Sequence, residues 1–330
     1  MDALSEIKRL YFNATKASIQ KDLARAIALL KAMPSDDDRV VLVSEDTHER
    51  VEAASPLDLG PQRLPLVARL VRHFGATGVQ VVTRSDSPVG AGIAGSSAMN
   101  IAVAAALAAW CGRSLTDDEL LTLAMNIEAQ VIGVPTGAQD YRPALFGGVS
   151  AVELGPAGVR RVALNVDADE LGRRVVLAYT GASRQSGINN WDVMQRRIGG
   201  DALVATAFDG IRDAAIGMRA ALERGDWSAV SACMASEWAH RQRLAPAVTT
   251  PTIDALLGAA RSAGASAGKV CGAGGGGCLV CLVDPEHRAA VVAALAKGGA
   301  TILPCAIERQ GLRLEGTGVD LWETRSGPSP

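Results

Sequence analysis

The sequence predicts an α+β fold, and three observations support this prediction. The chain has 330 residues, of which 48% are hydrophobic and 21% are charged, so it can bury a large core and form one large or two closely joined domains. Helical and strand patterns are mixed along the chain without the strict alternation that is typical of a doubly wound sheet. Glycine is abundant, at 35 residues, and many glycines lie in two clusters, at 90–95 and 272–277.

The first third of the chain combines helical and strand patterns. Apolar residues recur at helical spacing over residues 1–33, as at Leu4 and Ile7 and again at Ile27 and Leu30, which predicts helix. Strands and an amphipathic helix are expected after this segment. The expected elements are strands at 40–43, 50–53 and 78–83, a helix at 64–74, a loop at 85–95 and an Ala-rich buried helix at 96–111.

The next helix has a clear start. Thr116 is followed three residues later by Glu119, which is the capping-box pattern, and Asp117 and Asp118 favour the positive end of a helix. We therefore expect a helix from there to about residue 131. The later expected elements are strands at 147–152, 175–179, 278–283 and 300–307, mostly helix at 202–263, and a helix at 285–297.

Charge and composition argue against a nucleic-acid-binding protein. The chain has 33 basic and 35 acidic residues, for a net charge of -2, and only 4% aromatic residues. This balance provides neither the basic surface that attracts a polyanion nor the aromatic side chains on which bases stack. No nucleic-acid partner is therefore expected.

The N-terminus and the cysteines indicate a cytoplasmic protein. The charged residues Asp2, Glu6, Lys8 and Arg9 precede any apolar run, which is not the pattern of a signal peptide. No stretch approaches the ~18 to 20 apolar residues of a membrane span. The six cysteines include one lone CxxC pair at 278–281 and no metal-site spacing, so we interpret them as buried apolar residues in a reducing compartment.

The segment from Pro88 to Ala98 places glycine and serine residues around the start of a helix. Backbone N–H groups in such a segment can approach an anion closely, and the positive end of the helix favours it. Glycines keep side chains out of the way of phosphate oxygens. Serine hydroxyls can also bind phosphate oxygens or a magnesium ion. The segment is therefore suited to binding an anion such as phosphate.

Three other patterns compete with phosphate binding in this segment. A Walker A loop needs a lysine after its last glycine, and Ser96 follows Gly95, which excludes it. Gly90, Gly92 and Gly95 match the dinucleotide pattern GxGxxG, but the loop does not follow its strand directly and no acidic residue ends a second strand about 20 positions later. The glycines can also serve only a tight turn and close helix packing. The last two interpretations stay open.

Two carboxylates follow some thirty residues after the loop. Glu128 lies four residues after Ala124, beside the apolar stripe of its helix, so it is either at a solvated helix edge or points into a site. Gln139 and Asp140 follow a rigid turn that glycine and proline build at 133–137. An aspartate at such a place can also be a simple turn or cap residue.

A second glycine-rich segment runs from Lys269 to Gly277 and contains four consecutive glycines. Glycine loses more backbone entropy on folding than any other residue, so a geometric requirement must offset this loss. A bulged hairpin or close backbone packing is one such requirement. The residues alone favour that structural interpretation.

Both glycine-rich segments resemble motifs of the GHMP kinase family, which includes galactokinase, homoserine kinase, mevalonate kinase and phosphomevalonate kinase. Residues 92–98, Gly-Ile-Ala-Gly-Ser-Ser-Ala, are similar to the family's phosphate loop, and 269–277 resembles its third motif, Lys-x-x-Gly-Ala-Gly-x-Gly-Gly. The resemblance implies that the first loop wraps the phosphates of ATP and that the second lies against it beside the substrate. The implied ATP-binding residues are Pro88, Gly90, Gly92, Ile93, Ala94, Gly95, Ser96, Ser97 and Ala98.

The acidic segment resembles the family motif in which a helical Glu is followed by a Gly-x-x-x-Gly turn and a Gln-Asp or Met-Asp pair. The resemblance implies that Glu128 and Ser97 hold Mg²⁺ and that Asp140 is the general base toward a substrate hydroxyl. The sequence also departs from sugar kinases of the heptose type. Those usually carry a lysine in the turn and a glutamine after the aspartate, whereas Tyr141 and Arg142 follow Asp140 here.

A further segment, Tyr-Thr-Gly-Ala-Ser-Arg-Gln-Ser at 179–186, resembles part of the heptose 7-phosphate kinases that lies near the sugar. Arginine there is suited to a bidentate phosphate contact, and a plain surface turn is the alternative. The implied substrate-binding residues are Gln139, Asp140, Ser183, Arg184, Gly274 and Gly275.

The resemblance implies a two-lobed fold, with an N-terminal lobe like domain 2 of ribosomal protein S5 and a ferredoxin-like C-terminal lobe. We place the ATP-binding lobe at 36–165 and the C-terminal lobe at 166–325. The family normally begins with a strand and a glycine-rich first motif. Here residues 1–35 form an atypical charged segment with a helical pattern and no glycine.

These motifs together imply an ATP- and magnesium-dependent kinase that phosphorylates a hydroxyl of a sugar or sugar phosphate. A heptose 7-phosphate-like substrate is favoured, and a homodimer is one option for the assembly. A catalytically impaired nucleotide- or sugar-binding protein that lacks the first motif is the alternative within the family. A nicotinamide-dependent oxidoreductase is the alternative outside it.

Overall fold

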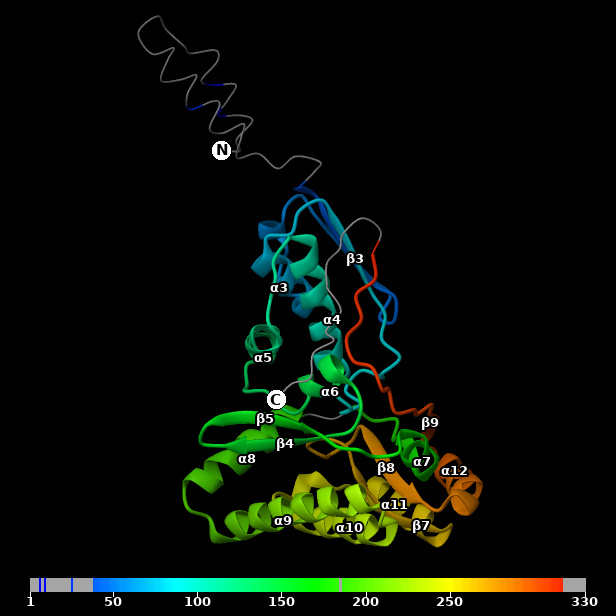
Figure 1. Ribbon diagram of the computed structural model, residues 1–330. Helices are drawn as coiled ribbons and strands as arrows, with labels where there is room; N and C mark the ends of the chain where they lie inside the picture. The colour runs from blue at the N-terminus through cyan, green and yellow to red at the C-terminus, as the bar shows by residue number, and fades with distance from the viewer. Residues whose placement is uncertain (1–5, 7–8, 10–24, 26–37, 184–185, 317–330) are drawn as a thin grey trace, which may run out of the picture. The chain divides into compact units, whose positions relative to one another are not determined.

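The computed structural model describes residues 6, 9, 25, 38–183 and 186–316 (Figure 1). The helix predicted over 1–33 lies outside the described residues except at three isolated positions, and Arg184 also lies outside them. The chain divides into two compact units, Met1–Arg84 with Leu107–Arg113 and Ser85–Ala106 with Ser114–Pro330. Each unit is described by itself.

A three-stranded sheet organises the first unit. The central strand β1 (Val40–Ser44) pairs antiparallel with β2 (Glu49–Ala53) and parallel with β3 (Val79–Thr83). The short helix η2 (Pro56–Asp58) and the helix α3 (Pro65–Phe74) connect β2 to β3. One face of α3 is buried, which confirms the amphipathic helix predicted at 64–74.

Two long helices follow the first glycine-rich segment. The Ala-rich helix α4 (Gly95–Trp110) is buried as predicted, and Ile101 and Ala104 are at most 1% exposed. The helix α5 (Asp117–Ile132) starts at the predicted capping box. The Thr116 hydroxyl accepts a hydrogen bond from the Glu119 amide, and the Glu119 carboxylate accepts one of 2.8 Å from the Thr116 amide.

The second unit contains an antiparallel hairpin, β4-β5, and a four-stranded sheet in which every pair is antiparallel, in the order β7-β8-β6-β9. The strands are β4 (Ser150–Gly155), β5 (Gly158–Ala163), β6 (Val175–Tyr179), β7 (Ala265–Val270), β8 (Cys278–Val283) and β9 (Thr301–Leu303). The helices are α6 (Tyr141–Phe146), α7 (Ala168–Arg174), α8 (Ser186–Ile198), α9 (Ala202–Arg224), α10 (Trp227–Gln242), η3 (Pro246–Val248), α11 (Pro251–Ser262), η4 (Pro285–His287) and α12 (Arg288–Lys297).

The strand β8 lies at the centre of the second unit's core. Leu279, Cys281 and Val283 join a buried cluster with residues of α11 and α12, whereas Leu282 lies in a second cluster with residues of α9, α10 and β7. Both faces of β8 are therefore buried, which explains its continuous apolar sequence. In Figure 1, α9 and α10 lie side by side along the lower edge of this unit.

The mixed α+β fold class is confirmed, and the predicted elements within the described residues are present. The strands β5 and β7 and the helices α6, α7 and α8 were missed. The strand β5 contains Arg160 and Arg161, which do not look like strand residues, but the Arg161 guanidinium lies 4.7 Å from the centre of the Phe146 ring and so packs against it. The strand β7 consists mainly of small residues, and its pairing with β8 overrides their weak strand propensity.

The cysteines agree in part with their interpretation as buried apolar residues. All six lie within the described residues and none forms a disulfide. Cys278 and Cys281 are buried, and burial raises the pKa of each thiol to about 11. The other four cysteines are only half-buried, at 111, 233, 271 and 305. Among the described helices, none is both long and apolar enough to cross a membrane.

Candidate active site

The loop that precedes α4 has a backbone suited to glycine. Gly90, Gly92 and Ala94 all have positive φ values, of 70°, 77° and 61°, in the left-handed region that non-glycine residues rarely adopt. The Ala91 amide donates a hydrogen bond of 3.0 Å to the Pro88 carbonyl and closes a turn. The predicted loop at a helix start is therefore present, and α4 begins directly after it.

Two serines in the first turn of α4 bind one carboxylate of α5. The Ser96 hydroxyl donates a hydrogen bond of 2.6 Å to Oε1 of Glu128, and the Ser97 hydroxyl donates one of 3.0 Å to Oε2. Glu128 is only 6% exposed, so its interpretation as a solvated helix edge is wrong. The structure brings together three of the residues to which the family resemblance assigned phosphate and metal binding.

A buried asparagine holds α5 against α4 one turn before this carboxylate. Asn100 is fully buried, and its Nδ2 donates a hydrogen bond of 2.7 Å to the Ala124 carbonyl. Since Ala124 lies four residues before Glu128, this bond fixes the part of the helix from which the carboxylate projects.

Tyr141 is a site residue that sequence reasoning did not assign. Its hydroxyl donates a hydrogen bond of 2.7 Å to Oε2 of Glu128, and the side chain is fully buried. Burial, together with the adjacent Glu128 carboxylate, raises the pKa of Tyr141 far above its ordinary value, so the hydroxyl stays a donor. One feature of the sequence could have indicated this role: Tyr141 directly follows Asp140, at the position where the chain departs from the family pattern.

Asp140 occupies the N-cap position of α6, is half-buried and makes no side-chain capping hydrogen bond. Asp140 thus occupies the turn and cap position of the alternative interpretation, but its side chain does not cap α6. The neighbouring Arg142 is 8% exposed and donates a hydrogen bond of 2.7 Å to the Ala138 carbonyl, which fixes the preceding turn. Gln139 is exposed, and its side chain folds back over Gly137.

The second glycine-rich segment contacts the first. It connects β7 to β8 in an antiparallel hairpin, as the structural interpretation predicted. The Cys278 amide also donates a hydrogen bond of 2.7 Å to the Ala91 carbonyl, and a Cβ on Gly277 would lie 2.5 Å from the same oxygen. The contact between the two loops that the family resemblance implied is present.

The turn after β6 joins these two loops. The Gly277 amide donates a hydrogen bond of 2.8 Å to the Ala182 carbonyl, and the Thr180 hydroxyl donates one of 2.8 Å to the Gly277 carbonyl. A Cβ on Gly90 would lie 1.9 Å from Oγ of Ser183. Ser183 therefore lies against the predicted phosphate loop, while Arg184 is outside the described residues.

Gly274 and Gly275, predicted to border the substrate, lie against η3. A Cβ on Gly274 would be 2.3 Å from the Val248 carbonyl oxygen, and the Gly275 amide donates a hydrogen bond of 3.0 Å to that oxygen. These glycines thus have a backbone-packing role whether or not a substrate lies beside them.

The dinucleotide interpretation of GxGxxG is wrong for the described chain. A dinucleotide-binding unit needs a parallel strand after the helix that follows the loop. After α4, every strand pair in the described residues is antiparallel.

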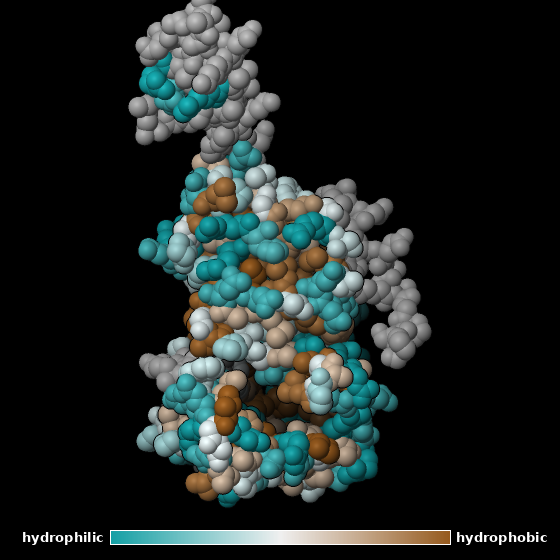
Figure 2. All heavy atoms as spheres, turned by 90° about the vertical axis from the view of Figure 1, so that its left-hand side faces the viewer, coloured by the Kyte–Doolittle hydropathy of each residue, from teal (hydrophilic) through white to brown (hydrophobic). Residues whose placement is uncertain are grey.

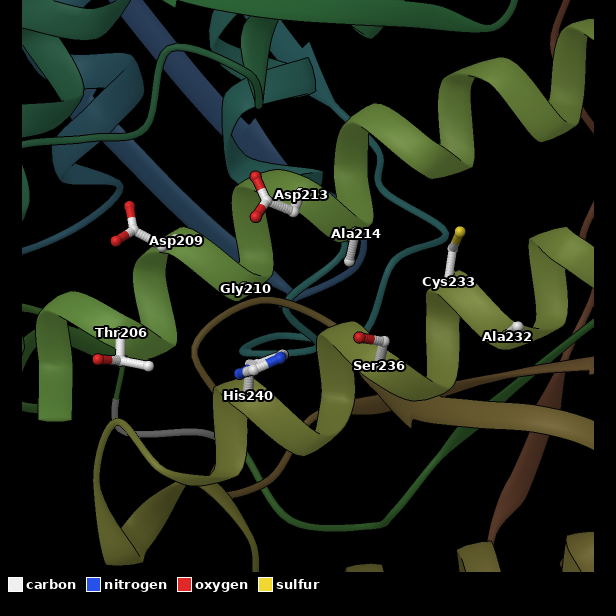
Figure 3. A pocket seen from close by; sticks show the side chains of 9 residues that line it. All are labelled: Thr206, Asp209, Gly210, Asp213, Ala214, Ala232, Cys233, Ser236 and His240. Atoms are coloured by element: carbon white, nitrogen blue, oxygen red, sulfur yellow. The ribbon is translucent and has the colours of Figure 1, made fainter.

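A cavity of about 600 Å³ lies between α9 and α10 (Figure 3). The His240 ring lies against Gly210, and Asp209 and Asp213 point away from it. Both aspartates form ion pairs with Arg212. None of the predicted site residues lines this cavity. Figure 2 shows the face of the molecule that is turned by 90° from the view of Figure 1. Hydrophobic residues surround a hollow in the lower part of this face.

The chain is similar to known kinases. Residues 63–148 match the GHMP kinases N terminal domain, and residues 218–301 match the GHMP kinases C terminal region. The chain is 29% identical over 293 residues to the D-glycero-alpha-D-manno-heptose 7-phosphate kinase of Campylobacter jejuni, with 84% of this chain and 85% of the relative covered. It is 28% identical over 283 residues to the mevalonate kinase of Thermococcus onnurineus, with 80% and 77% covered.

A solved structure shares the fold. The D-glycero-D-manno-heptose 1-phosphate kinase from Bacteriodes thetaiotaomicron superposes with a TM-score of 0.67 and 24% identity, over 86% of each chain. The homologues are kinases, and the resemblance seen in the glycine loops and the acidic segment is confirmed. Because the two matched regions together span more than half of its 330 residues, the chain belongs to the GHMP kinase family.

Proposed function

We propose that this protein is an ATP-dependent kinase that phosphorylates a hydroxyl of a sugar or sugar phosphate, with a heptose 7-phosphate as the favoured acceptor. The observation that carries the proposal is the buried Glu128 carboxylate, which accepts hydrogen bonds from Ser96 and Ser97. These hydrogen bonds connect a carboxylate that can bind a metal ion with a loop that can bind phosphate. The relative named a heptose 7-phosphate kinase supports the acceptor class.

ATP would bind with its phosphates at the loop 88–98. Gly90 and Gly92 keep the backbone free of side chains, and the first N–H groups of α4 have no partner within their own helix. A triphosphate at this end of a helix gains both hydrogen bonds and a favourable dipole.

The residues around Glu128 fit Mg²⁺. They offer one carboxylate and two serine hydroxyls, all of them oxygen donors, and Mg²⁺ in phosphate-transfer sites is usually bound by one or two carboxylates together with phosphate oxygens and water. Glu128 and Ser97 would hold the ion. When bound, it would offset the negative charge on the phosphate oxygens.

Asp140 would take the proton from the acceptor hydroxyl. The hydroxyl oxygen would then form a bond to the γ-phosphorus of ATP, and the bond to the β–γ bridging oxygen would break to release ADP. Ser183, Gln139, Gly274 and Gly275 are the described residues proposed to border the acceptor. The lobe boundaries at 36–165 and 166–325 stay part of the proposal.

The test is magnesium-dependent ADP release from ATP with a panel of acceptors. The panel contains heptose 7-phosphate, heptose 1-phosphate, galactose and mevalonate. Asp140→Asn should lower kcat by about 100-fold or more, because general-base catalysis contributes on the order of 10² to 10⁴ in rate. Asp118→Asn, an exposed aspartate in the first turn of α5, is the matched control and should retain activity.

Each outcome separates the candidate functions. Turnover with one sugar establishes the kinase and its substrate, while turnover with mevalonate alone contradicts the acceptor class. ATP binding without turnover favours the alternative, a catalytically impaired binding protein. Absence of ATP binding contradicts the proposed role of the loop.

A further inference from the structure

The carboxylate of Glu237 on α10 lies between two cationic side chains, Lys269 and Arg241, next to the second glycine-rich segment. Oε2 of Glu237 forms an ion pair with Nζ of Lys269, and its Oε1 lies 2.5 Å from the Arg241 guanidinium. The side chains of Glu237, Lys269 and Arg241 are only 12%, 21% and 25% exposed. The function proposed above uses none of these groups.

Burial and the neighbouring opposite charges both act on the pKa values of this cluster. Burial alone would raise the pKa of Glu237, but Lys269 and Arg241 outweigh this and hold the pKa below its ordinary value. Burial lowers the pKa of Lys269, and Glu237 opposes that shift. A buried ion pair is often no more stabilising than an apolar replacement. Stability alone therefore does not explain the cluster, and its contacts with the neighbouring loop indicate what it positions.

Both ion-pair partners of Glu237 are connected to the glycine loop 271–277, one through the chain and one through a hydrogen bond. Lys269 is the second-last residue of β7, and only Val270 separates it from the loop. Arg241 also donates a hydrogen bond of 3.3 Å to the Gly272 carbonyl, at the start of the loop. One carboxylate thus fixes the end of the strand and the first turn of the loop at the same time.

The far end of this loop holds the predicted phosphate loop. The Cys278 amide donates its 2.7 Å hydrogen bond to the Ala91 carbonyl, and Gly277 leaves no room for a side chain there. A continuous set of contacts therefore runs from α10 through 271–278 to residue 91, all within the second unit.

We propose that Glu237 is a positioning residue that, through Lys269 and Arg241, sets the glycine loop 271–277 and with it the phosphate loop. This inference rests on the proposed kinase function for its effect on catalysis. The loop position itself is a property of the protein without ligand. It can therefore be measured whether or not the protein proves to be a kinase.

The test compares Glu237→Gln with Glu223→Gln in the full chain. Glu223 is the matched control, because it is also a helical glutamate paired with an arginine four residues away but is 44% exposed. The first readout is hydrogen exchange of the peptide 271–281 without ligand. Glu237→Gln should speed exchange of the Gly277 and Cys278 amides at least tenfold, while Glu223→Gln leaves it unchanged.

The second readout is steady-state kinetics with Mg²⁺ and ATP. Glu237→Gln should raise the KM for ATP about tenfold and change kcat by less than threefold. The reason is that a displaced loop weakens the binding of the ATP phosphates but leaves the proposed base, Asp140, in place. Arg241→Met removes the Gly272 contact but leaves the Glu237–Lys269 pair. It should shift both readouts in the same direction, and it serves as the test if Glu237→Gln does not fold.

The two proposals fail in different ways. If the wild-type chain does not turn over ATP but Glu237→Gln still speeds loop exchange, the kinase function is wrong and the positioning role holds. If the wild type is active and the variants leave both exchange and KM unchanged, the positioning role is wrong.

Discussion

The hydroxyl of Tyr141 donates a hydrogen bond of 2.7 Å to the carboxylate of Glu128. This bond ties the first residue of α6 to a residue near the end of α5. The residue before Tyr141 is Asp140, so the proposed base and the proposed metal ligand are connected through one buried tyrosine. The position that departs from the family pattern is therefore part of the site's framework.

Tyr141→Phe should destabilise the fold by about 1 to 3 kcal/mol. It keeps the ring but removes one of three hydroxyl donors from a buried carboxylate, and a buried acceptor that loses a partner costs about that much. Urea unfolding followed by circular dichroism measures the change. Tyr179→Phe is the control, because the Tyr179 hydroxyl forms no hydrogen bond among the described residues. Equal stability of the two variants would contradict the assigned bond.

Glu128→Gln should reduce kcat by about 100-fold, because loss of one preorganised charge-stabilising group typically costs on the order of 10² to 10³ in rate. The amide can still accept a hydrogen bond from Ser96 or Ser97, so the fold should survive. The magnesium concentration for half-maximal rate should rise as well. A magnesium titration of activity measures both effects, with Glu286→Gln, which is 79% exposed, as the control. A normal magnesium dependence would remove Glu128 from the metal site.

The sequence predicted the parts of the site that depend on local backbone chemistry. The glycine loops and the capping box depend on residues close in the chain, so their patterns were visible. The contact between Tyr141 and Glu128 depends on how α6 packs against α5, which no local pattern encodes. The ion pair of Glu237 and Lys269 joins residues 32 positions apart in sequence. Glu237 was not singled out within the helical region expected at 202–263, and Lys269 was noted only as the first residue of a motif.

The secondary structure follows the same division. The amphipathic helix α3 and the apolar strand β8 were predicted because burial of one or both faces imposes a periodic sequence. The strand β5 was missed because Arg161 packs against the Phe146 ring, and this tertiary contact is not visible in the local sequence. Short elements whose stability comes from such contacts cannot be found from propensity alone.

Gly277→Ala should weaken ATP binding and destabilise the protein. The added Cβ would lie 2.5 Å from the Ala91 carbonyl oxygen, and the backbone has a φ of +78°. Gly181→Ala is the matched control, since its φ is +81° but no atom lies within 4 Å of the added Cβ. Both variants should lose about 1 to 2 kcal/mol from the left-handed backbone, and only Gly277→Ala should also raise the KM for ATP. Identical behaviour of the two would show that contact with Ala91 is unimportant.

Ala94→Gly should preserve activity and leave stability equal or slightly higher. Ala94 has a φ of +61°, and a left-handed alanine costs about 1 to 2 kcal/mol, whereas glycine at this position costs about 0.5 to 1 kcal/mol in backbone entropy. The net change in the free energy of unfolding should therefore lie between zero and about +1.5 kcal/mol. Gly92→Ala, two residues earlier at a φ of +77°, makes the opposite change and should destabilise. Urea unfolding of both variants measures the pair. A loss of stability in Ala94→Gly would mean that the alanine methyl group makes a packing contribution larger than the backbone strain.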